Sequence, residues 1–252
     1  MNTHRVTTRG TIPFPELASW SVDYQAVVAS IDPSNPSCRQ AFQDRLAQLW
    51  REAYLRHSPV VTELQIICEE GGTFILDWTG SILDEATIHD ESIPDNRLVA
   101  AFGISHGKEG RRPATRIRGF PRGGLGIVFS ELAQDFDRGH HLAHAAGGGV
   151  DINLYPQLAS VNRGRDDDGK IFRAMEIYAA SHAGTLVFSR PLYFGISDHP
   201  AAIDFGVLQT DGVLWQEVFR NVKTLEHLIA LDKALTLVGR RLPYRGGRRE
   251  GA

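Results

Sequence analysis

The chain is 252 residues long, with 42% hydrophobic, 23% charged and 9% aromatic residues, and its formal net charge is -3 at pH 7. This length fits one large domain or two small ones, and the composition excludes a disordered, collagenous or coiled-coil chain. A slightly acidic total argues mildly against a polyanion partner, because nucleic-acid-binding domains usually carry a basic surplus.

The cysteine content and hydropathy indicate a cellular compartment. Cys38 and Cys68 are too few for a disulfide scaffold or a four-cysteine zinc site, so we expect two thiols in a reducing environment. No stretch approaches the roughly 18 consecutive apolar residues that span a membrane, and residues 1–20 lack the apolar segment of a signal peptide. We therefore expect no membrane partner and a protein that is cytoplasmic or exported by a signal-peptide-independent secretion system.

A long amphipathic helix is predicted after a start over residues 1–38 that is rich in Pro, Ser and Thr. Residues 39–57 place six apolar side chains on one face at the 3.6-residue period of a helix. These are Phe42, Leu46, Leu49, Trp50, Ala53 and Tyr54. The opposite face is polar and charged, which predicts a helix that packs on a core through one side and ends before Pro59.

A β-hairpin is predicted directly after this helix. Residues 60–68 and 73–80 are rich in β-branched and aromatic side chains, which favour strands. The Glu-Glu-Gly-Gly segment between them supplies a turn. We therefore expect residues 1–105 to be an N-terminal region in which a helix packs on a small antiparallel sheet, with a docking or regulatory role.

A basic run follows this region. Between residues 107 and 126, six basic residues accompany the single acid Glu109: Lys108, Arg111, Arg112, Arg116, Arg118 and Arg122. Such a run is either a solvated edge or a surface for phosphates. Since much of the acidity lies earlier in the chain, the protein can present a basic cleft despite its acidic total. Further on, residues 184–196 predict a strand or strand pair, and residues 217–239 predict a helical tail.

Five short motifs then follow one another in order: DRGH at 137–140, GG at 147–148, NLYPQ at 153–157, VNRG at 161–164 and FRAME at 172–176. In this order they resemble the DNA/RNA non-specific endonucleases of the His-Me finger, or ββα-metal, class. The resemblance covers about residues 108–200. It implies an α+β fold whose mixed or antiparallel sheet accompanies a ββα-metal catalytic motif, with residues 106–252 as the endonuclease domain.

The residue types in these motifs suit phosphodiester hydrolysis. A neutral imidazole can take a proton from water near pH 7, so His140 is the candidate general base. Mg²⁺ keeps several waters and needs few protein oxygens, so the amide oxygen of Asn162 is a sufficient ligand, with Mn²⁺ as a substitute metal. Arg138 is placed to hold the phosphate in a bidentate fork. The resemblance assigns Glu176 to the metal through a water molecule.

Other residues of the motifs are expected to support this site. Asn153 and Gln157 are expected to brace the loop or touch nucleic acid. Phosphate contacts are expected from Arg116, Arg118, Arg122 and Arg163. Either Asp137 or a backbone carbonyl is expected to fix the tautomer of His140.

Two further expectations concern spacing. Asn162 and Glu176 are farther apart than in the family, which predicts residues 165–170 as a loop inserted before the helix. Alternation along a strand places His141 on the face opposite His140 and returns His144 to the face of His140, where it can touch phosphate.

The sequence thus favours a metal-dependent endonuclease that cuts DNA, RNA or both, because arginine and metal contacts to phosphate carry no sequence information. Two alternatives stay open: a non-catalytic polyanion-binding module, and a zinc-dependent hydrolase that uses His140 and His144. A nuclease must be restrained in its own cell, so we expect a toxin or a defence effector. Its partners would be nucleic acid, an immunity or regulatory protein, and a second copy of the chain in a homodimer.

Overall fold

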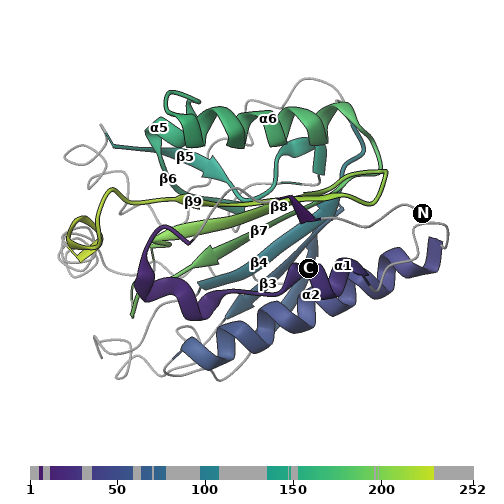
Figure 1. The fold of residues 1–252 in the computed structure, drawn as a ribbon, viewed down its shortest axis with the longest axis horizontal. Coiled ribbons are helices and arrows are strands. Elements are labelled where there is room, and N and C mark those ends of the chain that lie inside the picture. Colours follow the sequence, from purple (N-terminus) through teal and green to yellow (C-terminus); the bar gives the residue numbers. More distant parts are fainter. Residues whose placement is uncertain are drawn as a thin grey trace, which may run out of the picture.

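Figure 1 presents the computed structural model of the protein. It describes residues 6–7, 12–29, 36–58, 64–69, 71–77, 97–107, 135–146, 148, 153–195, 197 and 199–229. Arg116, Arg118 and Arg122 lie outside the described residues, so their phosphate contacts stay predictions. Within the described part of the chain, no helix combines the length and the apolar character that crossing a membrane requires.

The described secondary-structure elements come in runs of helices and runs of strands along the chain. In order they are β1 (Val6–Thr7), the 3-10 helix η1 (Pro15–Trp20), α1 (Tyr24–Ala29), α2 (Pro36–His57), β2 (Leu64–Glu69), β3 (Gly72–Asp77), β4 (Arg97–Ile104), β5 (Phe136–His140), the 3-10 helix η3 (His144–Ala146), β6 (Leu154–Leu158), α5 (Ala159–Asn162), α6 (Asp167–Ser181), β7 (Leu186–Leu192), β8 (Ala202–Leu208) and β9 (Leu214–Arg220). A short helical segment, 225–229, follows β9.

Most of the described strands form one seven-stranded sheet with the order β1-β9-β8-β7-β4-β3-β2. All neighbours in it are antiparallel except β1 and β9, which are parallel. Strands β5 and β6 pair only with each other, as a separate antiparallel hairpin. The expected α+β class with mixed or antiparallel sheets is therefore confirmed.

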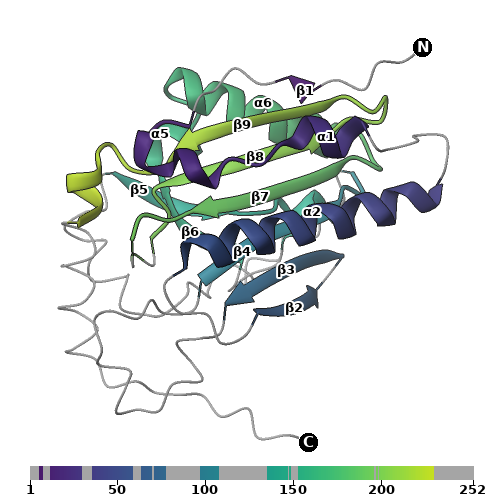
Figure 2. The same ribbon diagram turned by 60° about the horizontal axis from the view of Figure 1, so that its bottom comes forward.

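The large sheet is covered on both faces (Figures 1 and 2). Helices α1 and α2 lie on one face, where Trp50 packs against Phe188 of β7. The β5–β6 hairpin and α6 lie on the other, where Phe172 packs against Phe205 of β8. Because neither face meets water, every side chain of β7 is buried, as is usual for a doubly covered strand.

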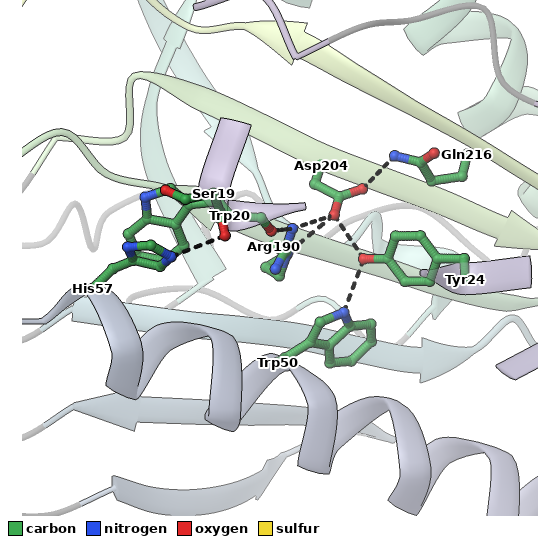
Figure 3. A network of polar contacts seen from close by, with 8 residues as sticks. All are labelled: Ser19, Trp20, Tyr24, Trp50, His57, Arg190, Asp204 and Gln216. Atoms are coloured by element: carbon green, nitrogen blue, oxygen red, sulfur yellow. Dashed lines mark hydrogen bonds and ion pairs between the residues drawn. The ribbon is translucent and has the colours of Figure 1, made fainter. Parts of the chain in front are cut away.

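A buried polar network ties the N-terminal helices to the large sheet (Figure 3). Asp204 of β8 accepts hydrogen bonds from Tyr24, Arg190 and Gln216. Arg190 also donates to the backbone carbonyl of Trp20 at 2.7 Å, and Trp50 donates to the hydroxyl of Tyr24. Every charge in this network has a partner, as burial requires, because an unpaired buried charge is strongly destabilising.

The two regions on either side of residue 105 share this sheet. Strands β2, β3 and β4 come from the N-terminal region, and β7, β8 and β9 come from the later one. Their side chains belong to a single hydrophobic core that also includes α1, α2 and α6. The docking or regulatory role of residues 1–105 stays a prediction, but these residues also build the framework on which the later region lies.

Several predicted elements can be compared with those observed. The predicted helix is α2, and its predicted apolar face is buried at Phe42, Leu46, Trp50, Ala53 and Tyr54. The predicted hairpin is β2–β3, which is the edge of the seven-stranded sheet rather than a small sheet of its own. Residues 184–196 contain the single strand β7. The predicted helical tail over 217–239 is wrong at its start, because residues 217–220 belong to β9.

Candidate functional site

The hairpin β5–β6 and the short helix α5 bring three of the five motifs together: DRGH, NLYPQ and VNRG. In the hairpin, His140 lies opposite Leu154 and Asp137 lies opposite Gln157. Helix α5 begins directly after β6 and ends at Asn162. Residues separated by 25 positions, Asp137 and Asn162, are thereby brought into contact.

Close packing inside the hairpin explains the glycine of the DRGH motif. A Cβ atom on Gly139 would lie 2.4 Å from the Cβ of Gln157, so a side chain there would displace the buried Gln157. Asn153 is also buried, and its amide both accepts from the backbone N–H of Leu142 at 2.8 Å and donates to the Leu142 carbonyl at 2.9 Å. The Asn153 side chain therefore braces the loop that follows His140.

Asp137 is the centre of a polar cluster that joins β5 to α5. Its Oδ2 accepts from Nδ2 of Asn162 at 3.2 Å and from Nε of Arg163 at 2.7 Å, and its Oδ1 accepts from an NH2 group of Arg163. Partial burial raises the pKa of Asp137, but the hydrogen bonds from Arg163 and Asn162 outweigh it and hold the pKa below its ordinary value. Asp137 therefore orients Asn162, and the group that fixes the tautomer of His140 stays a prediction.

We predict that Asp137→Asn weakens the site without unfolding the protein. An amide cannot accept both guanidinium donors as an anion does, so Asn162 loses its fixed orientation. Loss of a group that orients a metal ligand typically reduces metal affinity by about 10–100-fold. The measurement is the Mg²⁺ concentration that gives half-maximal cleavage, and an unchanged value would contradict this role of Asp137.

The same substitution has a defined pH signature. Because the folded-state pKa of Asp137 lies below its ordinary value of 3.8, its stabilising contribution is fully present above that value and is lost as pH falls through the lower folded-state pKa. The difference in melting temperature between wild type and Asp137→Asn should thus stay constant at neutral and mildly acidic pH and shrink only in strong acid.

The histidines of the hairpin have different environments. His140 is half-buried, whereas His141 is buried, lies within hydrogen-bonding distance of the Ser189 hydroxyl of β7 through Nδ1 and stacks on Tyr155. Burial, followed by the nearby His140, lowers the pKa of His141 to about 3. The two therefore point to opposite sides, as alternation along a strand predicts. His144 begins η3 and does not share a helix with His140.

A second buried histidine anchors the other end of the hairpin. His199 packs edge-on against Phe136, and burial is the main cause that lowers its pKa to about 3. Asn221 lies beside it, accepts from the backbone N–H of Leu158 at 3.0 Å and donates to the carbonyl of Pro156 at 2.9 Å. Asn221 thus fixes the end of β6 at Leu158, four residues before Asn162. No motif in the sequence indicated this role of Asn221.

These two neutral histidines predict a marked loss of stability in mild acid. Each has a folded-state pKa below its ordinary value of 6.5, so the unfolded chain binds more protons, and stability falls as pH drops below about 6.5. Each site contributes roughly 1.4 kcal/mol per pH unit in this range. Chemical denaturation from pH 7.5 to 5 should show the fall, and His141→Gln, which does not titrate, should reduce the slope. A flat profile would contradict the neutral buried state.

Glu176 approaches the hairpin from α6. Its side chain is half-buried, and its charge is the second cause, after burial, that raises the pKa of Tyr155 well above its ordinary value. Helix α6 begins earlier than expected, because Asp166 caps it by accepting from the backbone N–H of Gly169 at 2.7 Å. The segment expected as an inserted loop is thus a turn over 163–166 followed by the first turn of α6.

The potential metal ligands at this site suit a hard cation that is bound weakly. The Nδ2 of Asn162 is directed to Asp137, so the Oδ1 of Asn162 points away from Asp137. Among the described residues, no hydrogen-bond donor to this Oδ1 is seen. In the same part of the chain, no group of three or more His, Cys, Asp or Glu side chains could hold a metal. A single amide oxygen, together with water and phosphate oxygens, fits Mg²⁺, which keeps several waters. It does not fit a closed zinc site, which takes four protein ligands.

Fewer contacts are described for two of the predicted site residues, Arg138 and Arg163. Arg138 lies on β5 opposite Pro156, and only its backbone is described. Arg163 binds Asp137 through Nε and one NH2 group, so its predicted contact to phosphate would use the remaining NH2 group.

The chain was compared with protein families, with curated proteins and with solved structures. No family model matches it, and no curated protein matches it. Among solved structures, the Sda1 nuclease with a bound zinc ion is similar over 65% of this chain and 75% of that chain, with 15% sequence identity and a TM-score of 0.27. This likeness is too low to carry an argument about function.

Proposed function

We propose that this protein is a metal-dependent endonuclease that hydrolyses phosphodiester bonds of DNA, RNA or both without strong sequence preference. One observation carries the proposal: Asp137, three residues before His140 on β5, holds the amide of Asn162 at the end of α5. A base that can act near pH 7 and an oxygen ligand for a hard cation are thereby held on two adjoining elements. Along the chain, the β5–β6 hairpin is followed by Asn162 and then by α6. This order supports the resemblance to the His-Me finger nucleases.

In the proposed reaction, His140 takes a proton from the water that attacks phosphorus, and the bond to the 3′ oxygen breaks, which leaves a 5′-phosphate. Mg²⁺, or Mn²⁺ in its place, would neutralise charge on the scissile phosphate and stabilise the leaving oxygen. Asn162 would hold the metal directly, and Glu176 through a water molecule. Arg138 would bind the phosphate and stabilise the charge of the transition state.

A gel assay with the full-length protein tests the proposal. Supercoiled plasmid, linear duplex, single-stranded DNA and RNA are incubated with Mg²⁺, Mn²⁺, Zn²⁺ or EDTA. We expect cleavage in Mg²⁺, none in EDTA, and products that a ligase can join because they carry 5′-phosphates. Binding without cleavage would indicate a polyanion-binding module instead. Tightly bound stoichiometric zinc, with activity confined to small esters, would indicate a zinc hydrolase.

We propose a toxin or defence effector as the biological role. An unrestrained nuclease would damage the nucleic acid of its own cell, so an immunity or regulatory protein is a required partner under this hypothesis. The size of the particle in solution tests the homodimer. If the full-length chain is constitutively active and yet harmless on expression, the hypothesis of a restrained effector is wrong.

A further inference from the structure

The turn that joins α5 to α6 carries an unusual number of basic side chains within one stretch of the chain. Arg163, Arg165, Lys170 and Arg173 lie on it or on the first two turns of α6. Two of the four are neutralised by a carboxylate: Arg163 by Asp137, and Lys170 by Asp167.

Arg165 and Arg173 differ from the other two. Both are exposed, and neither forms an ion pair with any carboxylate that the structure describes. A Cβ atom on Gly164 would lie 3.4 Å from Cδ of Arg173, so the stem of Arg173 packs on the turn at Gly164, the residue before Arg165. The backbone N–H of Arg165 donates to the carbonyl of Ser160 at 2.8 Å, which anchors this residue to α5.

The location of this pair links it to the candidate site. Arg165 lies three positions after Asn162, and its charge is among those that act on Asp137, which binds Asn162. Two of the neighbouring aspartates make other contacts: Asp166 caps α6, and Asp167 binds Lys170. Two arginines without a described carboxylate partner therefore lie on the turn that follows Asn162 or pack against it.

We propose that Arg165 and Arg173 form a binding subsite for backbone phosphates that flank the scissile one in a polynucleotide. The inference rests on the proposed function, which supplies the scissile phosphate at Asn162. A guanidinium presents five N–H donors in a planar fork that matches phosphate oxygens. Such contacts set the register of the strand and carry no base information, in agreement with cleavage that lacks sequence preference.

The experiment compares two double variants of the full-length protein. Arg165→Gln with Arg173→Gln removes the proposed subsite. Arg51→Gln with Arg56→Gln is the matched control, because these exposed arginines lie on α2, across the sheet from α6, and the net charge changes equally (Figure 1). Binding of a fluorescent single-stranded oligonucleotide is measured in EDTA as a function of salt. Cleavage of the same oligonucleotide and of a small phosphodiester, thymidine 5′-(p-nitrophenyl phosphate), is measured in Mg²⁺.

We expect the subsite variant to bind the oligonucleotide about tenfold more weakly at physiological salt. The slope of log K against log salt should fall by about 1.4, because each phosphate contact to a single strand contributes about 0.7. The small phosphodiester should be cleaved at the wild-type rate, since it has no flanking phosphate.

Other outcomes separate the two proposals. Equal binding and equal salt slopes in the subsite and control variants would overturn the subsite, and so would equal losses in both. Loss of small-substrate cleavage in the subsite variant would also overturn it, because the arginines would then act at the scissile phosphate. A wild-type protein that binds the oligonucleotide but never cleaves it would overturn the proposed function, while the binding comparison would still decide the subsite.

Discussion

His140→Ala is expected to abolish cleavage of plasmid DNA in Mg²⁺ while nucleic-acid binding is largely retained. A positioned general base typically contributes roughly 10²–10⁴-fold to the rate, and alanine leaves no group in its place. His140 ends β5, so its substitution removes no hydrophobic core contact of the kind made by Phe136 or Leu142. The measurement is the rate of nicking, compared with oligonucleotide binding in EDTA.

Two controls make this result specific. His182→Ala alters an exposed histidine just after α6 and should leave the rate unchanged. Free imidazole should partly restore cleavage to His140→Ala, because it can enter the space that the side chain vacates and accept the proton. A fully active His140→Ala protein would contradict the assignment of the base even if the protein proves to be a nuclease.

The fold could be predicted from the sequence where one face of an element meets water. Helix α2 shows this well: Phe42, Leu46 and Trp50 recur at helical spacing between polar residues. Strands β4, β7 and β8 are covered on both faces, so they lack the alternation of apolar and polar residues that identifies a strand. This physical difference explains why β4 and β8 were not predicted, whereas β7 was predicted as an apolar run and not from alternation.

The end of β9 was predicted as the start of a helix, for a different reason. Residues 217–220 precede the helix-like spacing of Leu225, Leu228 and Ile229, and a short strand next to such a pattern is absorbed into it. Pairing with β8, along the whole length from Leu208 to Ala202, reveals the strand. The two strands form a hairpin, and the Asp211-Gly212 pair in its turn is the local signal that could have indicated it.

The candidate site shows the same division between local and distant information. His140, Asn162 and Glu176 were selected because their residue types and order suit the chemistry. The contact between Asp137 and Asn162 depends on hairpin register, and the support of β6 by Asn221 depends on a strand that was not predicted. The motifs therefore indicated which groups could react, whereas the groups that orient them could be identified only from the three-dimensional structure.

Asn162→Ala is expected to reduce metal-dependent cleavage by at least about 10²-fold, because it removes the direct ligand rather than a group that orients it. Partial recovery at high Mg²⁺ agrees with this role, since a weakened site can be filled by mass action. A Mg²⁺ titration of the cleavage rate is the measurement. Indifference to the substitution at every metal concentration would contradict the assignment of Asn162.

Asn162→Asp provides a sharper test, because a carboxylate is normally the better ligand for Mg²⁺. In this site the new carboxylate would replace an amide that donates to Asp137 at 3.2 Å. Two like charges about 4 Å apart repel by about 4 kcal/mol at the effective dielectric constant near a protein surface. We therefore expect Asn162→Asp to lose activity at neutral pH despite its stronger ligand.

The combined substitution Asp137→Asn with Asn162→Asp separates this repulsion from a simple loss of fit. It restores one amide and one carboxylate to the pair, so the two residues can again share a hydrogen bond with the amide as donor. If the amide and carboxylate act as a unit, the double variant should be more active than Asn162→Asp alone, which is a favourable coupling in a double-mutant cycle. If losses are simply additive, Asp137 does not act through Asn162, and the link between the hairpin and α5 has no part in catalysis.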